Sequence, residues 1–205
     1  MRRGYGDSGG QYAESSGPCG QREYLRAAWQ SASDLRAAVE AMGSRTDVST
    51  NGMIAVGVSA SGFASLALTA NAPPGLAAAI NFAGGRGSRS DNDVCDEDAL
   101  VRAFATLGRT SRIPTLWIYA QSDKFFGPEL ARRMHAAFTG AGGRVQFIDV
   151  APFGDDGAIA NIATAAIARQ GPRGIFRLSL REPAPGLCRL AEGSFRFPQR
   201  APVDA

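Results

Sequence analysis

Apolar positions along this 205-residue chain fall into two alternating patterns. Short runs that are almost entirely apolar are typical of strands buried on both faces of a parallel sheet, and they occupy residues 53–58, 77–82, 115–120 and 145–150. Segments whose apolar residues recur three or four positions apart indicate amphipathic helices, and they occupy residues 23–42, 63–70, 96–107, 128–139 and 159–169. Strands that alternate with helices in this way predict βαβ units. The predicted fold class is therefore α/β, a parallel sheet flanked by helices.

The pattern changes after residue 170. Prolines and arginines interrupt the short apolar stretches from Gly171 onward, and such a composition does not favour a packed core. We expect one domain over residues 1–170 and a weakly structured tail over residues 171–205.

A serine follows the first predicted strand, in the sequence Gly57-Val58-Ser59-Ala60-Ser61-Gly62. A strand, a sharp turn and a helix are the setting of a nucleophile elbow, which lifts a serine hydroxyl above the carboxyl edge of a sheet. The turn crowds the positions two before and two after the serine, and Gly57 and Ser61 are both small. The elbow also makes the backbone N–H of Ala60 an oxyanion-hole donor. The simpler alternative is that Ser59 is only a helix N-cap.

Four stretches together resemble a bacterial α/β-hydrolase of the dienelactone-hydrolase-like group. They read RRGYGDSGG at residues 2–10, GVSASGF at 57–63, NFAGG at 81–85 and PFGDDG at 152–157. The resemblance implies part of an α/β-hydrolase fold, with about four core strands and without the N-terminal part of the domain. Dienelactone hydrolases proper use a cysteine nucleophile, whereas Ser59 stands at that position here. The resemblance therefore implies general ester hydrolysis, with a small-molecule ester or lactone as substrate and no cofactor or metal.

The triad acid of this family comes after the nucleophile and before the histidine in the chain. The resemblance places it at Asp123, just past the third predicted strand. Its carboxylate would hold the histidine in the correct tautomer and stabilise the imidazolium. An aspartate at this position is often only a helix cap, so that alternative remains open. Phe125 and Phe126 follow it and either line an acyl pocket or belong to the core.

The triad histidine is missing from its expected position. The family places it after Asp156-Gly157, where this chain has Ala158, and the single histidine of the sequence is His135. His135 lies about seven residues into the helix that follows Asp123, which descends roughly 10 Å from the catalytic edge at 1.5 Å per residue. We interpret His135 as a helix-surface residue and the catalytic base as absent.

Without its base, a serine hydroxyl is a poor nucleophile, and loss of a triad member leaves only about 10³–10⁴-fold acceleration. The second oxyanion donor of the complete fold comes from a loop after its third strand, and this chain resembles the fold only from the loop after the fourth. We expect the protein to be inactive or impaired as an esterase. The strand that carries Ser59 would then have an open apolar edge, through which the chain could self-associate.

Two other functional interpretations remain. The chain is either a non-catalytic binding or interaction module on a hydrolase scaffold, or the truncated or frame-shifted product of a gene for an active hydrolase. The mid-domain start and the loss of resemblance after Gly157 motivate the second of these. Sequencing upstream of codon 1 and across codon 158 would separate them.

Charge and composition exclude other classes of partner. The net charge is +3, but it is carried by scattered arginines and a single lysine, Lys124. A nucleic-acid-binding protein would show a basic stripe with interleaved aromatic residues, so we expect no nucleic-acid partner. No run of 18 apolar residues is present, so no membrane span is expected. The first eight residues lack the apolar segment of a signal peptide, so none is expected there. Because the natural N-terminus is expected to be missing, both a cytoplasmic and a periplasmic or secreted location remain open.

Three cysteines and two charged or glycine-rich loops complete the list of candidate sites. Cys19, Cys95 and Cys188 are either buried or free thiols, or Cys19 and Cys95 form a bridge in an oxidising compartment. Residues 84–88 lack the third glycine of a dinucleotide-binding loop. The acidic residues between positions 91 and 98 do not match a calcium loop and are better interpreted as the solvated start of a helix.

Overall fold

The computed structural model describes residues 18–152. Its elements, in chain order, are α1 (Tyr24–Gly43), β1 (Met53–Val58), α2 (Ala60–Ala70), β2 (Leu76–Phe82), β3 (Ser88–Ser90), β4 (Asp93–Val94), α3 (Glu97–Gly108), β5 (Thr115–Ala120), α4 (Pro128–Gly140) and β6 (Val145–Val150). The helix predicted at residues 159–169, the tail 171–205 and Ala158 lie outside the described residues.

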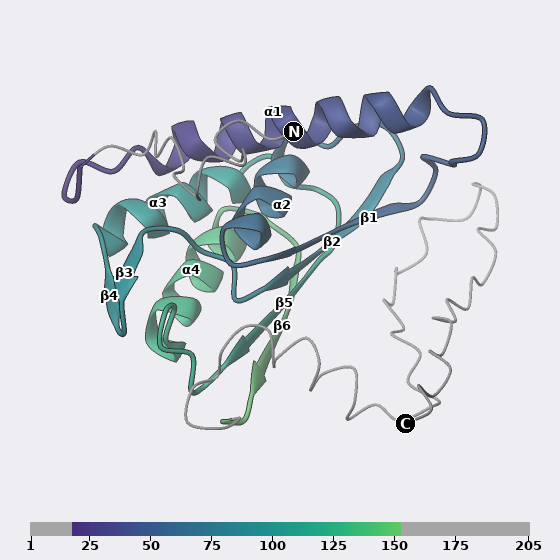
Figure 1. Ribbon diagram of the computed structural model, residues 1–205. Helices are drawn as coiled ribbons and strands as arrows, with labels where there is room; N and C mark the ends of the chain where they lie inside the picture. The colour runs from purple at the N-terminus through teal and green to yellow at the C-terminus, as the bar shows by residue number, and fades with distance from the viewer. Residues whose placement is uncertain (1–17, 153–205) are drawn as a thin grey trace, which may run out of the picture. The chain divides into compact units, whose positions relative to one another are not determined.

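The main sheet has four parallel strands in the order β1-β2-β5-β6. The four helices of the described range lie on the same side of this sheet, with α1 above α2 and the strands running diagonally below them (Figure 1). Because all strands are parallel, their carboxyl ends meet at one edge, which is where open α/β sheets bind ligands. The α/β class and the parallel sheet predicted from the sequence are confirmed.

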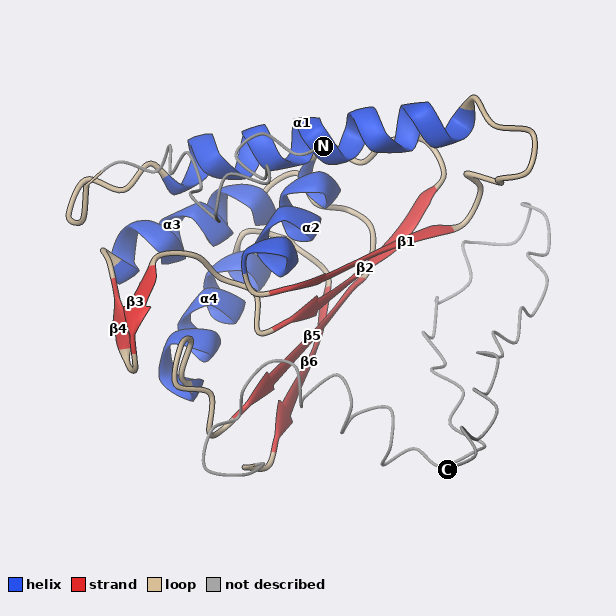
Figure 2. Cartoon of the chain, viewed as in Figure 1, coloured by secondary structure: helices blue, strands red, loops and turns tan. Residues whose placement is uncertain are grey.

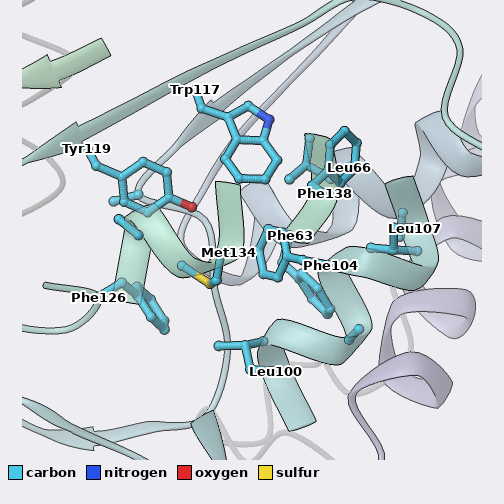
Figure 3. Packing of buried hydrophobic residues seen from close by; sticks show 14 of the residues in the cluster. Phe63, Leu66, Leu100, Phe104, Leu107, Trp117, Tyr119, Phe126, Met134 and Phe138 are labelled. Carbon is cyan, nitrogen blue, oxygen red and sulfur yellow. The ribbon is translucent and has the colours of Figure 1, made fainter. Parts of the chain in front are cut away.

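An aromatic cluster fills the space between the sheet and its helices. Trp117 of β5 has its ring centroid 5.3 Å from that of Phe104 on α3 and 5.1 Å from that of Phe138 on α4. Phe63 of α2 lies 5.2 Å from Phe104, and Figure 3 shows these rings converging with Met134. One continuous core therefore joins α2, α3 and α4 to strand β5.

The short polar hairpin formed by β3 and β4 (Figure 2) was not predicted from the sequence. Its strands are too short and polar to give an apolar pattern, and it is held by one contact distant in sequence and one across its own base. The Asn92 N–H donates to the Lys124 carbonyl at 2.6 Å, and the Cys95 N–H donates to the Gly87 carbonyl at 3.0 Å.

A disulfide joins Cys19 to Cys95, with Cα atoms 5.1 Å apart. The sequence left open whether Cys19 and Cys95 are thiols or form a bridge, and the structure has the bridge. It ties the segment before α1 to the segment before α3, across 76 positions of sequence. The Tyr24 hydroxyl donates to the Cys95 carbonyl beside it.

Candidate active site

Ser59 stands between β1 and α2 in an unusual backbone conformation. Its φ is 52° and its ψ is −124°, a region that non-glycine residues rarely adopt and that is a mark of functional strain. Neighbouring hydrogen bonds hold it there: its N–H donates to the Phe82 carbonyl, and its carbonyl accepts from Phe63 and Gly85. Ser59 occupies the N-cap position of α2, but its side chain makes no capping hydrogen bond. The helix begins at Ala60 rather than at the predicted residue 63 because the turn leads directly into it.

The glycine two positions before Ser59 is required by the tightness of this turn. A Cβ on Gly57 would lie 2.1 Å from the Ser61 carbonyl oxygen and 2.6 Å from the Gly62 nitrogen. Ser61 itself has an exposed side chain, so a serine fits where the usual motif has a second glycine. The turn therefore has the close approach that the sequence motif predicted.

The loop after β2 packs against the turn at Ser59 through a buried polar pair that the sequence analysis missed. Asn81 donates from Nδ2 to the Tyr119 hydroxyl at 3.1 Å, and that hydroxyl donates to the Gly84 carbonyl at 2.6 Å. A Cβ on Gly62 or Gly84 would lie 2.3 or 1.8 Å from Asn81 Oδ1. The only sequence signal was an amide within an otherwise apolar strand.

Tyr119 also lies near the carboxylate of Asp123. Burial raises the pKa of Tyr119 above its ordinary value, and the charge of Asp123 adds to the rise. The hydroxyl therefore stays protonated and remains the donor to the Gly84 carbonyl.

Asp123 lies in the turn after β5, at the same sheet edge as Ser59, and its side chain is only 3% exposed. Its Oδ1 accepts from the backbone N–H groups of Phe125 at 2.7 Å and Phe126 at 3.0 Å. The carboxylate therefore caps a tight turn that precedes α4, whose own N-cap is Gly127. The position of Asp123 at the carboxyl edge is compatible with both alternatives left open by the sequence, a triad acid and a cap.

The two phenylalanines after Asp123 lie differently. Phe126 is buried in the core, and a Cβ on Gly85 would lie 2.4 Å from its ring. Phe125 is partly buried and packs against the core. The glycine-rich loop after β2 is thus small at Gly84 and Gly85 because Asn81 and Phe126 fill the space beside it.

His135 lies on α4, away from the strand ends. Its ring stacks on Phe147 of β6 with centroids 4.8 Å apart and meets the edge of Trp117 at 6.0 Å. Burial lowers the pKa of His135 below its ordinary value. The side chain is half-buried against the middle of two strands, which makes it more enclosed than the surface position expected from the sequence.

The acidic residues between positions 91 and 98 form the start of α3 and its ion pairs. Asp96 Oδ1 accepts from the Ala99 N–H at 3.1 Å as a helix cap. Arg133 of α4 pairs with Glu97 at 2.8 Å and also with Asp98. Residues 18–152 hold no cluster of three or more side chains able to bind a metal ion, and none of their helices is long and apolar enough to cross a membrane.

This chain is similar to known proteins in its structure. No family model matches the sequence and no curated protein matches it. A dipeptidyl aminopeptidase IV from Bacteroides ovatus superposes with a TM-score of 0.60 at 14% identity, over 82% of this chain and 25% of that one. A dienelactone hydrolase from Klebsiella pneumoniae gives 0.51 at 16% identity, over 70% of this chain and 59% of that one. The acylaminoacyl peptidase of Pyrococcus horikoshii gives 0.50 at 12% identity, over 69% of this chain and 25% of that one.

These similarities establish a class of fold. The described residues form part of an α/β-hydrolase fold, in which a strand, a sharp turn and a helix meet at Ser59. The dienelactone hydrolase resemblance stated from the sequence is matched by one of these structures. The chain spans 59% of that protein and a quarter of the two peptidases.

Proposed function

We propose that this chain is a serine-hydrolase-type protein of the carboxylic-ester hydrolase kind whose catalysis is impaired. The observation that carries the proposal is the backbone of Ser59, held at φ 52° and ψ −124° between a parallel strand and a helix. A strained serine in this setting is the hallmark of a nucleophile elbow. Its substrate would be a small-molecule ester or lactone.

Each residue of the site has an assigned role in this proposal. Ser59 would attack the acyl carbon, the Ala60 N–H would stabilise the oxyanion, and Asp123 would orient a histidine. The family resemblance expects that histidine at residue 158, where this chain has Ala158, so no general base would accept the serine proton. The buried carboxylate of Asp123, at the same edge as Ser59, supports its place in this arrangement.

Hydrolysis of p-nitrophenyl acetate tests the impairment. We expect the unmodified chain and Ser59→Ala to give the same rate, because a serine without a base contributes little. Clear turnover by the unmodified chain that Ser59→Ala abolishes would show that the protein is a working esterase.

Restoring the base tests the assigned roles. Ala158→His should raise the rate at least about tenfold. General-base catalysis contributes about 10²–10⁴-fold, and the incomplete oxyanion hole reduces this gain. The gain should vanish in the double variants with Ser59→Ala or Asp123→Asn. A gain that survives Ser59→Ala would reject Ser59 as the nucleophile.

A non-catalytic interaction module is the second candidate function. It is favoured by the exposed apolar side chains of β1, where Ile54 is 45% and Val56 is 58% exposed. A saturable ligand or a stable partner of the purified chain would support it.

A further inference from the structure

A buried tyrosine lies at the start of a hydrogen-bonded path that leads to the turn at Ser59. Tyr119 of β5 is 1% exposed, and Figure 3 shows its ring among the apolar side chains of the core. Its hydroxyl donates to the Gly84 carbonyl at 2.6 Å. Buried tyrosine hydroxyls usually have a partner, so this bond by itself indicates only a satisfied side chain. Its importance comes from the peptide group that it reaches.

The direction of the Tyr119 hydroxyl is determined from its other side. Asn81 of β2 donates from Nδ2 to the Tyr119 oxygen at 3.1 Å. A tyrosine hydroxyl has one proton to donate, and because its oxygen already accepts from Asn81, that proton is directed to Gly84. Burial raises the pKa of Tyr119, so the hydroxyl keeps this proton at neutral pH.

The Gly84 carbonyl belongs to the same peptide group as the Gly85 N–H. That N–H donates to the Ser59 carbonyl at 3.2 Å. A peptide group is planar and rigid, so a bond that fixes its carbonyl also fixes the direction of its N–H. Both glycines are buried, and a Cβ on Gly84 would lie 1.8 Å from Asn81 Oδ1. The Tyr119 hydroxyl therefore supports the hydrogen bond that Ser59 accepts from this loop.

The Ser59 carbonyl in turn shares a peptide group with the Ala60 N–H. This peptide is trans, so its carbonyl and its N–H point in opposite directions. Ala60 is the first residue of α2, and the N–H groups of the first turn of a helix have no partner within that helix. The bond from Gly85 to the Ser59 carbonyl therefore directs the Ala60 N–H away from the loop. Hydrogen bonds in such a chain also polarise one another, so each bond strengthens the next.

We propose that Tyr119 is a positioning residue for the oxyanion-hole donor: through the Gly84–Gly85 peptide group it fixes the direction of the Ala60 N–H. The proposal rests on the proposed function, which assigns the oxyanion to that N–H. Such a donor must point to the place where the oxyanion forms, and a strained turn keeps one geometry only where its surroundings determine it. The core supplies a fixed reference, because the Tyr119 ring lies 6.3 Å from that of Trp117 and 5.8 Å from that of Phe147.

Amide proton exchange, measured by NMR on the isotope-labelled full chain, tests this path without requiring turnover. In the unmodified chain the Gly85 N–H should exchange at least about 100-fold more slowly than that of Gly52. Gly85 is buried and hydrogen-bonded, whereas Gly52 lies in an exposed turn. Tyr119→Phe should speed exchange at Gly85 at least about fivefold and shift the amide proton resonances of Gly85 and Ala60.

Tyr24→Phe is the matched control, because Tyr24 is also 1% exposed and its hydroxyl also donates to a backbone carbonyl, that of Cys95. Each variant removes one buried hydroxyl, so both should destabilise the fold to a similar extent. Only Tyr119→Phe should change the exchange at Gly85 relative to the amides of the core. Exchange at Gly85 that neither variant changes, or that both raise equally, overturns the proposal.

Fluorinated tyrosine gives a second route that does not depend on Tyr119→Phe folding. Incorporation of 3-fluorotyrosine keeps every hydroxyl but makes the phenol more acidic and therefore a stronger donor. The Gly85 amide proton resonance should then move downfield, opposite to its shift in Tyr119→Phe, because a stronger bond at Gly84 polarises the same peptide group. A Gly85 resonance that fluorination leaves in place overturns the proposal.

Turnover in an Ala158→His background separates the failure of this proposal from the failure of the proposed function. There Tyr119→Phe should lower kcat for p-nitrophenyl acetate about tenfold with KM unchanged, since it misaligns a donor that acts in the transition state. Tyr24→Phe should leave both constants unchanged. A background without turnover rejects the catalytic roles, while the exchange measurements still decide whether Tyr119 positions the Ala60 N–H. An active background in which Tyr119→Phe leaves kcat unchanged overturns the positioning role.

Discussion

The turn at Ser59 can close because Gly57 has no Cβ. Gly57 has backbone atoms of Ser61 and Gly62 within 2.6 Å of the place where a Cβ would stand. Backbone cannot move aside as a flexible side chain can, so a larger residue must open the turn. The strained φ of Ser59 is therefore maintained by a residue two positions away.

Gly57→Ala should lower the free energy of unfolding by about 1–3 kcal/mol, the usual cost of overpacking. Gly140→Ala is the matched control, because a Cβ on Gly140 meets nothing within 4 Å and this glycine ends α4. Its effect should be small or stabilising, since alanine favours a helix more than glycine does. Urea unfolding measures both, and equal values for the two variants would contradict the steric argument.

At this scale the sequence predicted the residues of the turn but not those that support it. Ser59, Gly57 and Ala60 are close in sequence, so a local motif is enough to find them. Asn81 and Tyr119 reach the same site from β2 and β5. Their role depends on which strands are neighbours, and no local pattern contains that information.

The predicted strands agree closely with the structure, since each is a short apolar run bounded by turn residues. β1, β5 and β6 have the predicted bounds, and β2 begins one residue earlier, at Leu76. The β3–β4 hairpin could not be predicted, because its short polar strands give no apolar pattern and because the contact with Lys124 and the disulfide come from distant parts of the chain. Elements that bury apolar surface can be predicted from the sequence, whereas elements held by distant contacts cannot.

The packing of α4 against β6 makes the fold sensitive to pH through His135. Burial lowers the pKa of this side chain from its ordinary value of 6.5, so protonation is less favourable in the folded state than in the unfolded chain. The free energy of unfolding should therefore fall as the pH drops below about 6.5 and level off below the folded pKa. Above pH 7 both states are neutral and the residue has no effect.

Urea unfolding between pH 5 and 7.5 measures this dependence, and His135→Gln is the control. It is the single histidine of the chain, so the variant should lose most of the slope in this interval. A slope that persists unchanged in His135→Gln would assign it to other groups.

The Cys19–Cys95 bridge acts on the molecule as a whole because it closes a long loop. It spans 76 positions and connects the start of α1 to the start of α3, on either side of β1, α2 and β2. Cross-linking distant positions limits the unfolded chain, and natural disulfides typically contribute about 2–4 kcal/mol in this way. Cys95 is buried and Cys19 is exposed, so a reductant can reach the bridge from one side.

Cys19→Ser with Cys95→Ser should therefore lower the free energy of unfolding by about 2–4 kcal/mol and remove the effect of dithiothreitol on the melting temperature. The unmodified protein should melt lower in dithiothreitol than without it. Cys188→Ser, which leaves both bridged cysteines in place, is the matched control and should keep that dependence. Because bridges persist only under oxidising conditions, the measurement needs protein purified without reductant. A melting temperature that dithiothreitol leaves unchanged in all three proteins would mean that the bridge does not hold these helices together in solution.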